Sequence, residues 1–130
     1  MTATDSTDRS GFEIAVETRY VERESEPEAN RYVFAYTITI SNHGDAPGQL
    51  LNRHWWITDG QGEVDEVEGP GVVGQQPRIP PGQAFRYTSA AVLSTPVGAM
   101  HGTYEFRRDD GSRFEVPIPA FSLYIPSMVH

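Results

Sequence analysis

The sequence predicts an all-β fold, an immunoglobulin-like sandwich of about seven to eight short strands. Three observations carry this prediction. Apolar and β-branched residues alternate with polar residues at a period of two in several segments. Turn signals rich in Gly, Pro, Asn and Asp separate these segments. No segment keeps the helical period of roughly 3.6 residues over the length of an ordinary helix.

The predicted elements follow one another along the chain. Residues 1–10 are small and polar without periodicity, and we expect them to form a disordered N-terminal tail. Residues 11–130 form one predicted domain. Its first strand, residues 12–20, alternates apolar with polar and charged side chains, and its strongest strand, residues 31–41, combines aromatic and β-branched residues. Further strands are predicted at residues 50–58, 63–69, 84–93, 99–108 and 113–126.

Composition weakens several classes of function. The chain has no Cys, which excludes disulfides, thiolate metal sites and a cysteine nucleophile. Its formal net charge is -8, so nucleic acids and anionic membrane surfaces are poor partners, and the adjacent pair Arg107 and Arg108 is too small to reverse this. No apolar run approaches the ~20 residues that cross a bilayer, and the N-terminus has no signal-peptide core. We predict a soluble cytoplasmic protein without membrane insertion.

The stretch GPGVVG contains the spacing G-x-G-x-x-G through Gly69, Gly71 and Gly74. In a dinucleotide-binding fold such a loop opens a helix that holds the pyrophosphate, and an acid follows roughly 20 residues later. Here several prolines follow the loop, and no acid occurs between Glu68 and Glu105. The glycines are therefore interpreted as a tight crossing between strands. A nest of backbone N–H groups that binds an anion is the alternative.

Histidines and acids are the candidate metal ligands. The four imidazoles, which lack the spacing of compact metal sites, are His43, His54, His101 and His130. In the acidic stretch, Glu63 and Asp65 share one face of a strand, whereas Glu66 and Glu68 share the other. This division separates the oxygen ligands that a cation such as Mg²⁺ would need. We therefore predict no dedicated metal site and no cofactor, and only weak cation binding.

Two consecutive aromatic residues mark a candidate contact surface. Trp55 and Trp56 lie in one predicted strand and must face opposite sides of it. One ring is then partly exposed, and Trp56 is the candidate for contacting a partner because Trp is favoured in binding hot spots. No Ser stands in a G-x-S-x-G motif or in a recognisable order with His and an acid, so a serine hydrolase is not predicted.

Several short motifs occur in an order that resembles one known family. They are N-R-H-W, G-P-G-V-V-G, P-P-G, Y-T-S, M-x-G and V-P-I-P-A-F-S-L, between about Ile14 and Pro126. This order resembles the ApaG (CorD) family, from which the chain departs slightly at Trp56 and in its acidic N-terminal extension. The resemblance implies a fibronectin type III-like β-sandwich and a genetic association of bacterial members with cobalt and magnesium resistance and efflux. It also implies reuse as a protein-binding domain in larger eukaryotic proteins, and it brings no catalytic residues.

These observations together predict a non-catalytic protein-interaction module, an accessory protein linked to cobalt and magnesium homeostasis or efflux, and not an enzyme. Its partner is an unidentified protein that is neutral or basic at the contact, and homodimer formation stays open. The expected contact sites are the loop of Gly69, Gly71 and Gly74, the exposed Trp56, and a sheet edge without protecting prolines. The alternative is a nucleotide- or pyrophosphate-binding protein that uses the GPGVVG loop.

Overall fold

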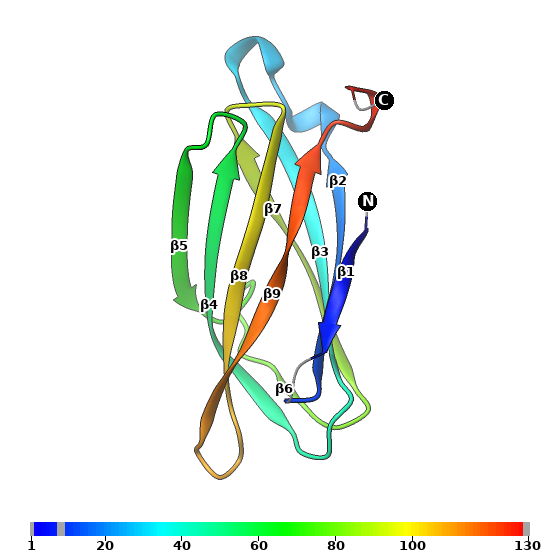
Figure 1. Cartoon of the computed structure of the whole chain (residues 1–130), viewed down its shortest axis with the longest axis vertical. Helices are drawn as coiled ribbons and strands as arrows, with labels where there is room; N and C mark the ends of the chain where they lie inside the picture. The colour runs from blue at the N-terminus through cyan, green and yellow to red at the C-terminus, as the bar shows by residue number, and fades with distance from the viewer. Residues whose placement is uncertain (1, 8–9, 129–130) are drawn as a thin grey trace.

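Two antiparallel sheets pack face to face in the computed structural model, which describes residues 2–7 and 10–128 (Figure 1). One sheet has the strand order β1-β2-β3-β7, and the other has the order β5-β4-β8-β9 with the short β6 paired to β4. The predicted all-β sandwich is thereby confirmed. The first sheet consists of β1 (Thr2–Thr7), β2 (Phe12–Tyr20), β3 (Tyr32–Asn42) and β7 (Ala84–Leu93). The second consists of β4 (Gly48–Asp59), β5 (Val64–Pro70), β6 (Arg78–Ile79), β8 (Val97–Arg107) and β9 (Arg113–Tyr124).

Helical structure is limited to single turns among the described residues. These 3-10 turns are η1 (Glu22–Glu24), η2 (Pro27–Ala29) and η3 (Pro126–Met128). The first two lie in the charged connection between β2 and β3, where Pro27 begins η2 and Asn30 ends it with a left-handed backbone. No helix in the described part of the chain has the length and hydropathy needed to cross a membrane.

The core lies between the sheets and follows the period-two pattern of the sequence. In β2, Phe12, Ile14 and Val16 are fully buried and alternate with more exposed side chains. From the second sheet Trp55 points into the same space, where its ring lies 5.5 Å from that of Tyr36. Such aromatic contacts bury large areas and favour edge-to-face geometry, which is the geometry of this pair. The alternation therefore assigns one face of each sheet to the core.

The N-terminal segment differs from its sequence-based prediction. The sequence predicts a disordered tail over residues 1–10, whereas the structure pairs residues 2–7 with the edge of β2 as β1. Residues 1, 8 and 9 lie outside the described residues. Strand pairing at an edge proceeds through backbone hydrogen bonds, so it needs no alternation of apolar side chains. Hydrophobic periodicity consequently carries no signal for such a strand.

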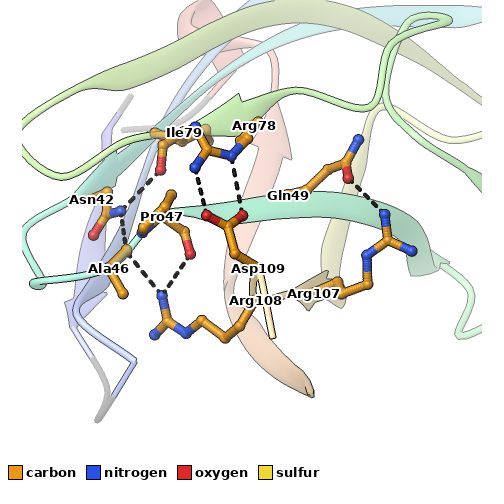
Figure 2. A network of polar contacts seen from close by, with 9 residues as sticks. All are labelled: Asn42, Ala46, Pro47, Gln49, Arg78, Ile79, Arg107, Arg108 and Asp109. Carbon is orange, nitrogen blue, oxygen red and sulfur yellow. Dashed lines mark hydrogen bonds and ion pairs between the residues drawn. The ribbon is translucent and has the colours of Figure 1, made fainter. Parts of the chain in front are cut away.

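At the end of the sandwich that is lowest in Figure 1, arginine side chains connect the β3–β4 turn with the β8–β9 loop (Figure 2). Arg108 donates to the carbonyls of Ala46 and Pro47 at 3.0 and 3.1 Å, and its guanidinium lies 4.3 Å from the ring centre of Phe114. Beside it, Arg78 pairs with Asp109 at 2.6 Å. The hydrogen bond from Arg78 lowers the pKa of that carboxyl group. These arginines therefore connect the β3–β4 turn, β6 and the β8–β9 loop, which gives Arg108 a structural role.

Candidate functional site

The glycine-rich stretch folds into a tight turn and is not followed by a helix. Val72 and Gln75 exchange two backbone hydrogen bonds of 2.8 and 2.9 Å. Between them, Val73 and Gly74 have φ angles of 43° and 79°, the positive values that a type I′ turn requires. The short strand β6 comes next. We name residues 69–76 the glycine hairpin; it lacks the helix N-terminus on which a dinucleotide-binding loop depends.

The glycines of the motif have local structural reasons. Gly71 has a φ of +63°, and a Cβ atom there would lie 2.3 Å from the carbonyl oxygen of Gln75. Gly69 lies next to the guanidinium of Arg53, which a Cβ atom would approach to 3.1 Å. Gly74 occupies the second position of the turn. The G-x-G-x-x-G spacing is thus explained by how the hairpin packs, without a ligand.

Arg53 connects the glycine hairpin to a small pocket between the sheets. Its Nη1 donates to the carbonyls of Pro70 and Gly71, at 3.0 Å in each case. The pocket has a volume of about 200 Å³ and contains no carboxylate in its lining. We name it the tyrosine pocket; its lining residues are Tyr36, Arg53, Trp55, Val72, Val73, Gly74, Tyr87 and Ser89. Within a chain of net charge -8, this lining carries a single guanidinium as its charged group.

The tyrosine hydroxyls around this pocket stay protonated at neutral pH. Burial raises the pKa of Tyr36, although its hydrogen bond with Ser89 and the charge of Arg53 act in the opposite direction. Burial also raises the pKa values of Tyr87 and Tyr104, whose hydroxyls are hydrogen-bonded to each other. The pocket therefore offers hydroxyl donors and a cation, a set that suits an oxyanion. It offers no group with a pKa near neutrality for proton transfer.

The outer face of the second sheet carries an aromatic stack made of His54, Trp56 and His101. The Trp56 ring lies 3.8 Å from that of His54, at an interplanar angle of 21°, and 5.3 Å from that of His101, at 8°. Trp56 is half-buried, whereas its neighbour Trp55 is 2% exposed in the core. The prediction that one of the two consecutive tryptophans is partly exposed is confirmed by this arrangement. Its role in binding stays a prediction.

Pairing of β4 with β5 brings a histidine to two acids. The register places His54 opposite Glu68 and Trp56 opposite Glu66, so these side chains share the outer face. His54 Nε2 lies 2.7 Å from Glu66 Oε2 and 3.7 Å from Glu68 Oε1. The sequence pattern separates Glu66 and Glu68 from the remaining acids, but it does not show that His54 faces them. Strand register, which no local pattern gives, decides this contact.

A shallow hollow extends from this cluster across β4, β8 and β9. It has a volume of about 480 Å³ and is bordered by Glu68, Glu105 and Glu115. Asn52 projects between them and donates to Glu105 Oε1 at 2.6 Å. We name it the acidic hollow. Three carboxylates and one guanidinium, that of Arg53, line the hollow, so its acidic side favours a ligand that carries hydrogen-bond donors.

Comparison with known proteins identifies the family. A family model described as the ApaG domain matches residues 22–108. The chain belongs to the ApaG family. Its relatives include the protein ApaG of Acidithiobacillus ferrooxidans, 58% identical over 119 residues, covering 92% of this chain and 94% of the relative. The protein ApaG of Azotobacter vinelandii is 52% identical over 122 residues, covering 94% of this chain and 97% of the relative.

Solved structures of the family share the sandwich. A crystal structure of an ApaA protein from Bordetella pertussis has a TM-score of 0.86 and 50% identity, covering 88% of this chain and 94% of that chain. A further X-ray structure has a TM-score of 0.88 and 46% identity, covering 92% and 91% of the two chains. The family resemblance that the sequence motifs show is therefore confirmed, together with its fold. None of these names states a catalytic activity.

The remaining candidate residues of this ApaG chain do not assemble into a catalytic group. His43 lies in the turn between β3 and β4 and pairs with Glu13 at 2.9 Å. Thr88 shares a hydrogen bond with Thr37, and Ser89 lines the tyrosine pocket. His130 lies outside the described residues. Among residues 2–7 and 10–128, the one group of metal-ligating side chains is formed by His54, Glu66 and Glu68.

Proposed function

We propose that this ApaG chain is a non-catalytic protein-binding module whose contact surface is the outer face of the second sheet around Trp56. The aromatic stack carries the proposal. In Figure 1 the strands β4, β5 and β8 belong to the sheet that lies nearer the viewer. A large ring fixed on a strand buries area at a low cost in conformational entropy, which is why aromatic residues dominate binding hot spots.

The chemistry of this surface favours a partner segment that bears Arg or Lys. Glu66 and Glu68 flank Trp56 through the β4–β5 register, and the acidic hollow continues toward Glu105. A cationic side chain can then pair with a carboxylate while it packs on the indole. Val64 is 54% exposed and lies opposite Thr58 on the same face, so it extends the apolar part of the contact.

Affinity capture from the native cell tests this proposal when variants are compared. Immobilised wild-type protein, Trp56→Ala and Val92→Ala are used as baits, where Val92 is an exposed residue of β7 in the first sheet. We expect a partner that binds wild type and Val92→Ala, and whose purified form binds Trp56→Ala about tenfold or more weakly. Its affinity should also fall as salt is added, because charges contribute to the contact. Equal retention by all three baits overturns the assigned surface.

The physiological setting that we propose is cobalt and magnesium homeostasis, and it is supported by the family resemblance alone. A strain without the gene should change its tolerance of cobalt salts, and the wild-type gene should restore the original tolerance. If the binding surface serves this role, the Trp56→Ala gene should restore it poorly. If the Trp56→Ala gene restores cobalt tolerance fully, the homeostatic role does not depend on the proposed surface.

A second candidate function is supported by the tyrosine pocket. Its guanidinium and hydroxyl donors, its volume of about 200 Å³ and its position beside the glycine hairpin suit a small oxyanion such as phosphate or pyrophosphate. Backbone NMR signals of residues 71–75 should then shift on titration with pyrophosphate, and less so in Ser89→Ala. ATP is the comparison ligand, because a shared response indicates that the phosphates are bound. Unchanged signals with both ligands remove this candidate.

A further inference from the structure

We propose that His54, Glu66 and Glu68 form a binding site for a divalent transition-metal ion of the Zn²⁺ class on the outer face of the second sheet. The ligand atoms, one from each side chain, all lie within 4.8 Å of one another. Two of the separations, from His54 Nε2 to the two carboxylate oxygens, are 2.7 and 3.7 Å. This inference does not rest on the protein-binding function.

These separations agree with the size of a coordination shell. Zn²⁺ binds imidazole nitrogen and carboxylate oxygen at ~2.0–2.2 Å, so two ligand atoms of a tetrahedral ion lie about 3.3–3.5 Å apart. The two observed distances fall on either side of that value. The Glu66 and Glu68 side chains are 53% and 67% exposed, so both are free to rotate toward an ion beside His54.

The imidazole is the ligand that the fold holds most firmly. His54 projects from β4, a strand paired on both sides, with β5 and with β8. Its ring stacks on the indole of Trp56 at 3.8 Å, which fixes the plane of the imidazole. A ligand whose orientation is set before the ion arrives loses less entropy on binding. The two glutamates come from one neighbouring strand, at positions that point to the same face.

The ligand set selects the class of ion. An imidazole with two carboxylates suits borderline ions such as Zn²⁺ and Ni²⁺. Mg²⁺ prefers an octahedral shell of oxygens, keeps several waters and gains little from an imidazole. Three protein ligands leave at least one coordination position for water or for a donor from another molecule. Because the glutamates are exposed, we expect reversible binding that is weaker than in a buried structural zinc site.

The chain supplies its own control. His43 and Glu13 form a pair at 2.9 Å, close to the 2.7 Å between His54 and Glu66, and His43 is more exposed than His54. This pair is not part of the three-ligand group that the described residues contain. A general affinity of His–Glu pairs for metal ions would therefore be seen equally at His43. If Zn²⁺ binding depends on His54 and not on His43, the ion is bound by the group in which His54 meets Glu66 and Glu68.

Calorimetric titration of the purified chain with ZnCl₂ tests the proposal, with Glu66→Gln/Glu68→Gln, His54→Gln and His43→Gln as variants. We expect one Zn²⁺ per chain for wild type and for His43→Gln, and binding at least tenfold weaker for the other two. Excess Mg²⁺ should leave the wild-type titration unchanged. Glutamine is close in shape to the glutamates that it replaces at the exposed positions 66 and 68. A thermal melt of each variant confirms that it is folded.

Tryptophan fluorescence provides a second readout that depends on position. Ni²⁺ at the site should quench the emission of Trp56, whose ring touches His54, and Zn²⁺ should reverse this by displacing it. Quenching should be retained in His43→Gln and lost in Glu66→Gln/Glu68→Gln. The proposal is overturned if wild type binds no Zn²⁺, if its affinity survives in both site variants, or if Mg²⁺ competes on equal terms. Both measurements use the isolated protein, so their result is independent of any protein partner.

Discussion

Trp55 and Trp56 are consecutive residues of β4 whose rings lie on opposite faces of the second sheet. The Trp55 ring makes edge-on contacts with Tyr36 and Phe121 in the core, at 5.5 and 5.9 Å. The Trp56 ring stacks on His54 at the outer surface. One dipeptide thus links the interior of the sandwich to the surface that we propose as functional. The two rings can be removed separately.

Replacement of each tryptophan by Ala should have very different effects on stability. Trp55→Ala removes a fully packed ring and should lower the free energy of unfolding by about 3–5 kcal/mol. Trp56→Ala removes a half-buried ring on a solvent-facing surface and should cost about 1 kcal/mol. Urea unfolding measures both values. If Trp56→Ala destabilised the chain as strongly as Trp55→Ala, its ring would be part of the core and unsuitable as a binding anchor.

Most strands could be predicted from the sequence because most of them bury one face; β5 is an exception, since its residues are mostly exposed. The predicted strand at residues 84–93 coincides with β7, and the predicted strand at 31–41 differs from β3 by one residue at each end. Pro117 and Pro119 indicate an edge or a bulge, and β9 does lie at the end of its sheet with a register shift opposite Met100–Gly102. In each case the signal is local to the segment. β1 and the two-residue β6 carry no such signal.

The candidate sites could be predicted only in part because they depend on contacts between distant strands. The exposure of one tryptophan follows from strand alternation. The meeting of His54 with Glu66 and Glu68 depends on the β4–β5 register, which the turn between these strands sets. The tyrosine pocket likewise combines Tyr36 with Arg53 and the hairpin, three segments that only the finished sandwich brings together.

Arg108 should contribute far more to stability than its neighbour Arg107. Arg108 donates to three backbone carbonyls, those of Ser10, Ala46 and Pro47, and lies over an aromatic ring. Arg108→Ala leaves these carbonyls without that donor and should cost about 2–3 kcal/mol. Arg107 is exposed and donates to Gln49, so Arg107→Ala should change the free energy of unfolding by about 0.5 kcal/mol or less. Equal effects in urea unfolding would contradict the role assigned to Arg108.

Substitutions at Gly71 and Gly74 of the glycine hairpin distinguish the cost of a steric clash from the cost of a strained backbone angle. Gly71→Ala combines a positive φ with a Cβ atom 2.3 Å from the Gln75 carbonyl oxygen, and should cost about 3 kcal/mol or more. Gly74→Ala meets no atom within 4 Å and retains only the strain of its φ of +79°, so about 1 kcal/mol is expected. Thermal melts give the order of the two variants. If Gly74→Ala were the more destabilising variant, the close contact between Gly71 and the Gln75 carbonyl would not be what stabilises the hairpin.

The buried tyrosines should make the fold sensitive to alkaline pH. An unperturbed tyrosine has a pKa of 10.0, and burial raises the pKa values of Tyr36, Tyr87 and Tyr104 in the folded chain. Below pH 10 both states hold these protons, so the full stability is present. As the pH rises beyond 10, the unfolded chain loses them first, and the free energy of unfolding must fall.

Urea unfolding at stepped alkaline pH measures this slope, and tyrosinate absorbance shows when the phenols ionise. We expect the buried phenols to ionise together with unfolding rather than before it. Tyr87→Phe removes one of the raised groups, so its stability should fall less steeply with pH than that of the wild type. At neutral pH the same variant should lose about 1 kcal/mol, because the Tyr104 hydroxyl loses its hydrogen-bond partner. An alkaline slope that is unchanged in Tyr87→Phe would show that this hydroxyl is open to water in the folded state, and it would place the base of the tyrosine pocket at the surface.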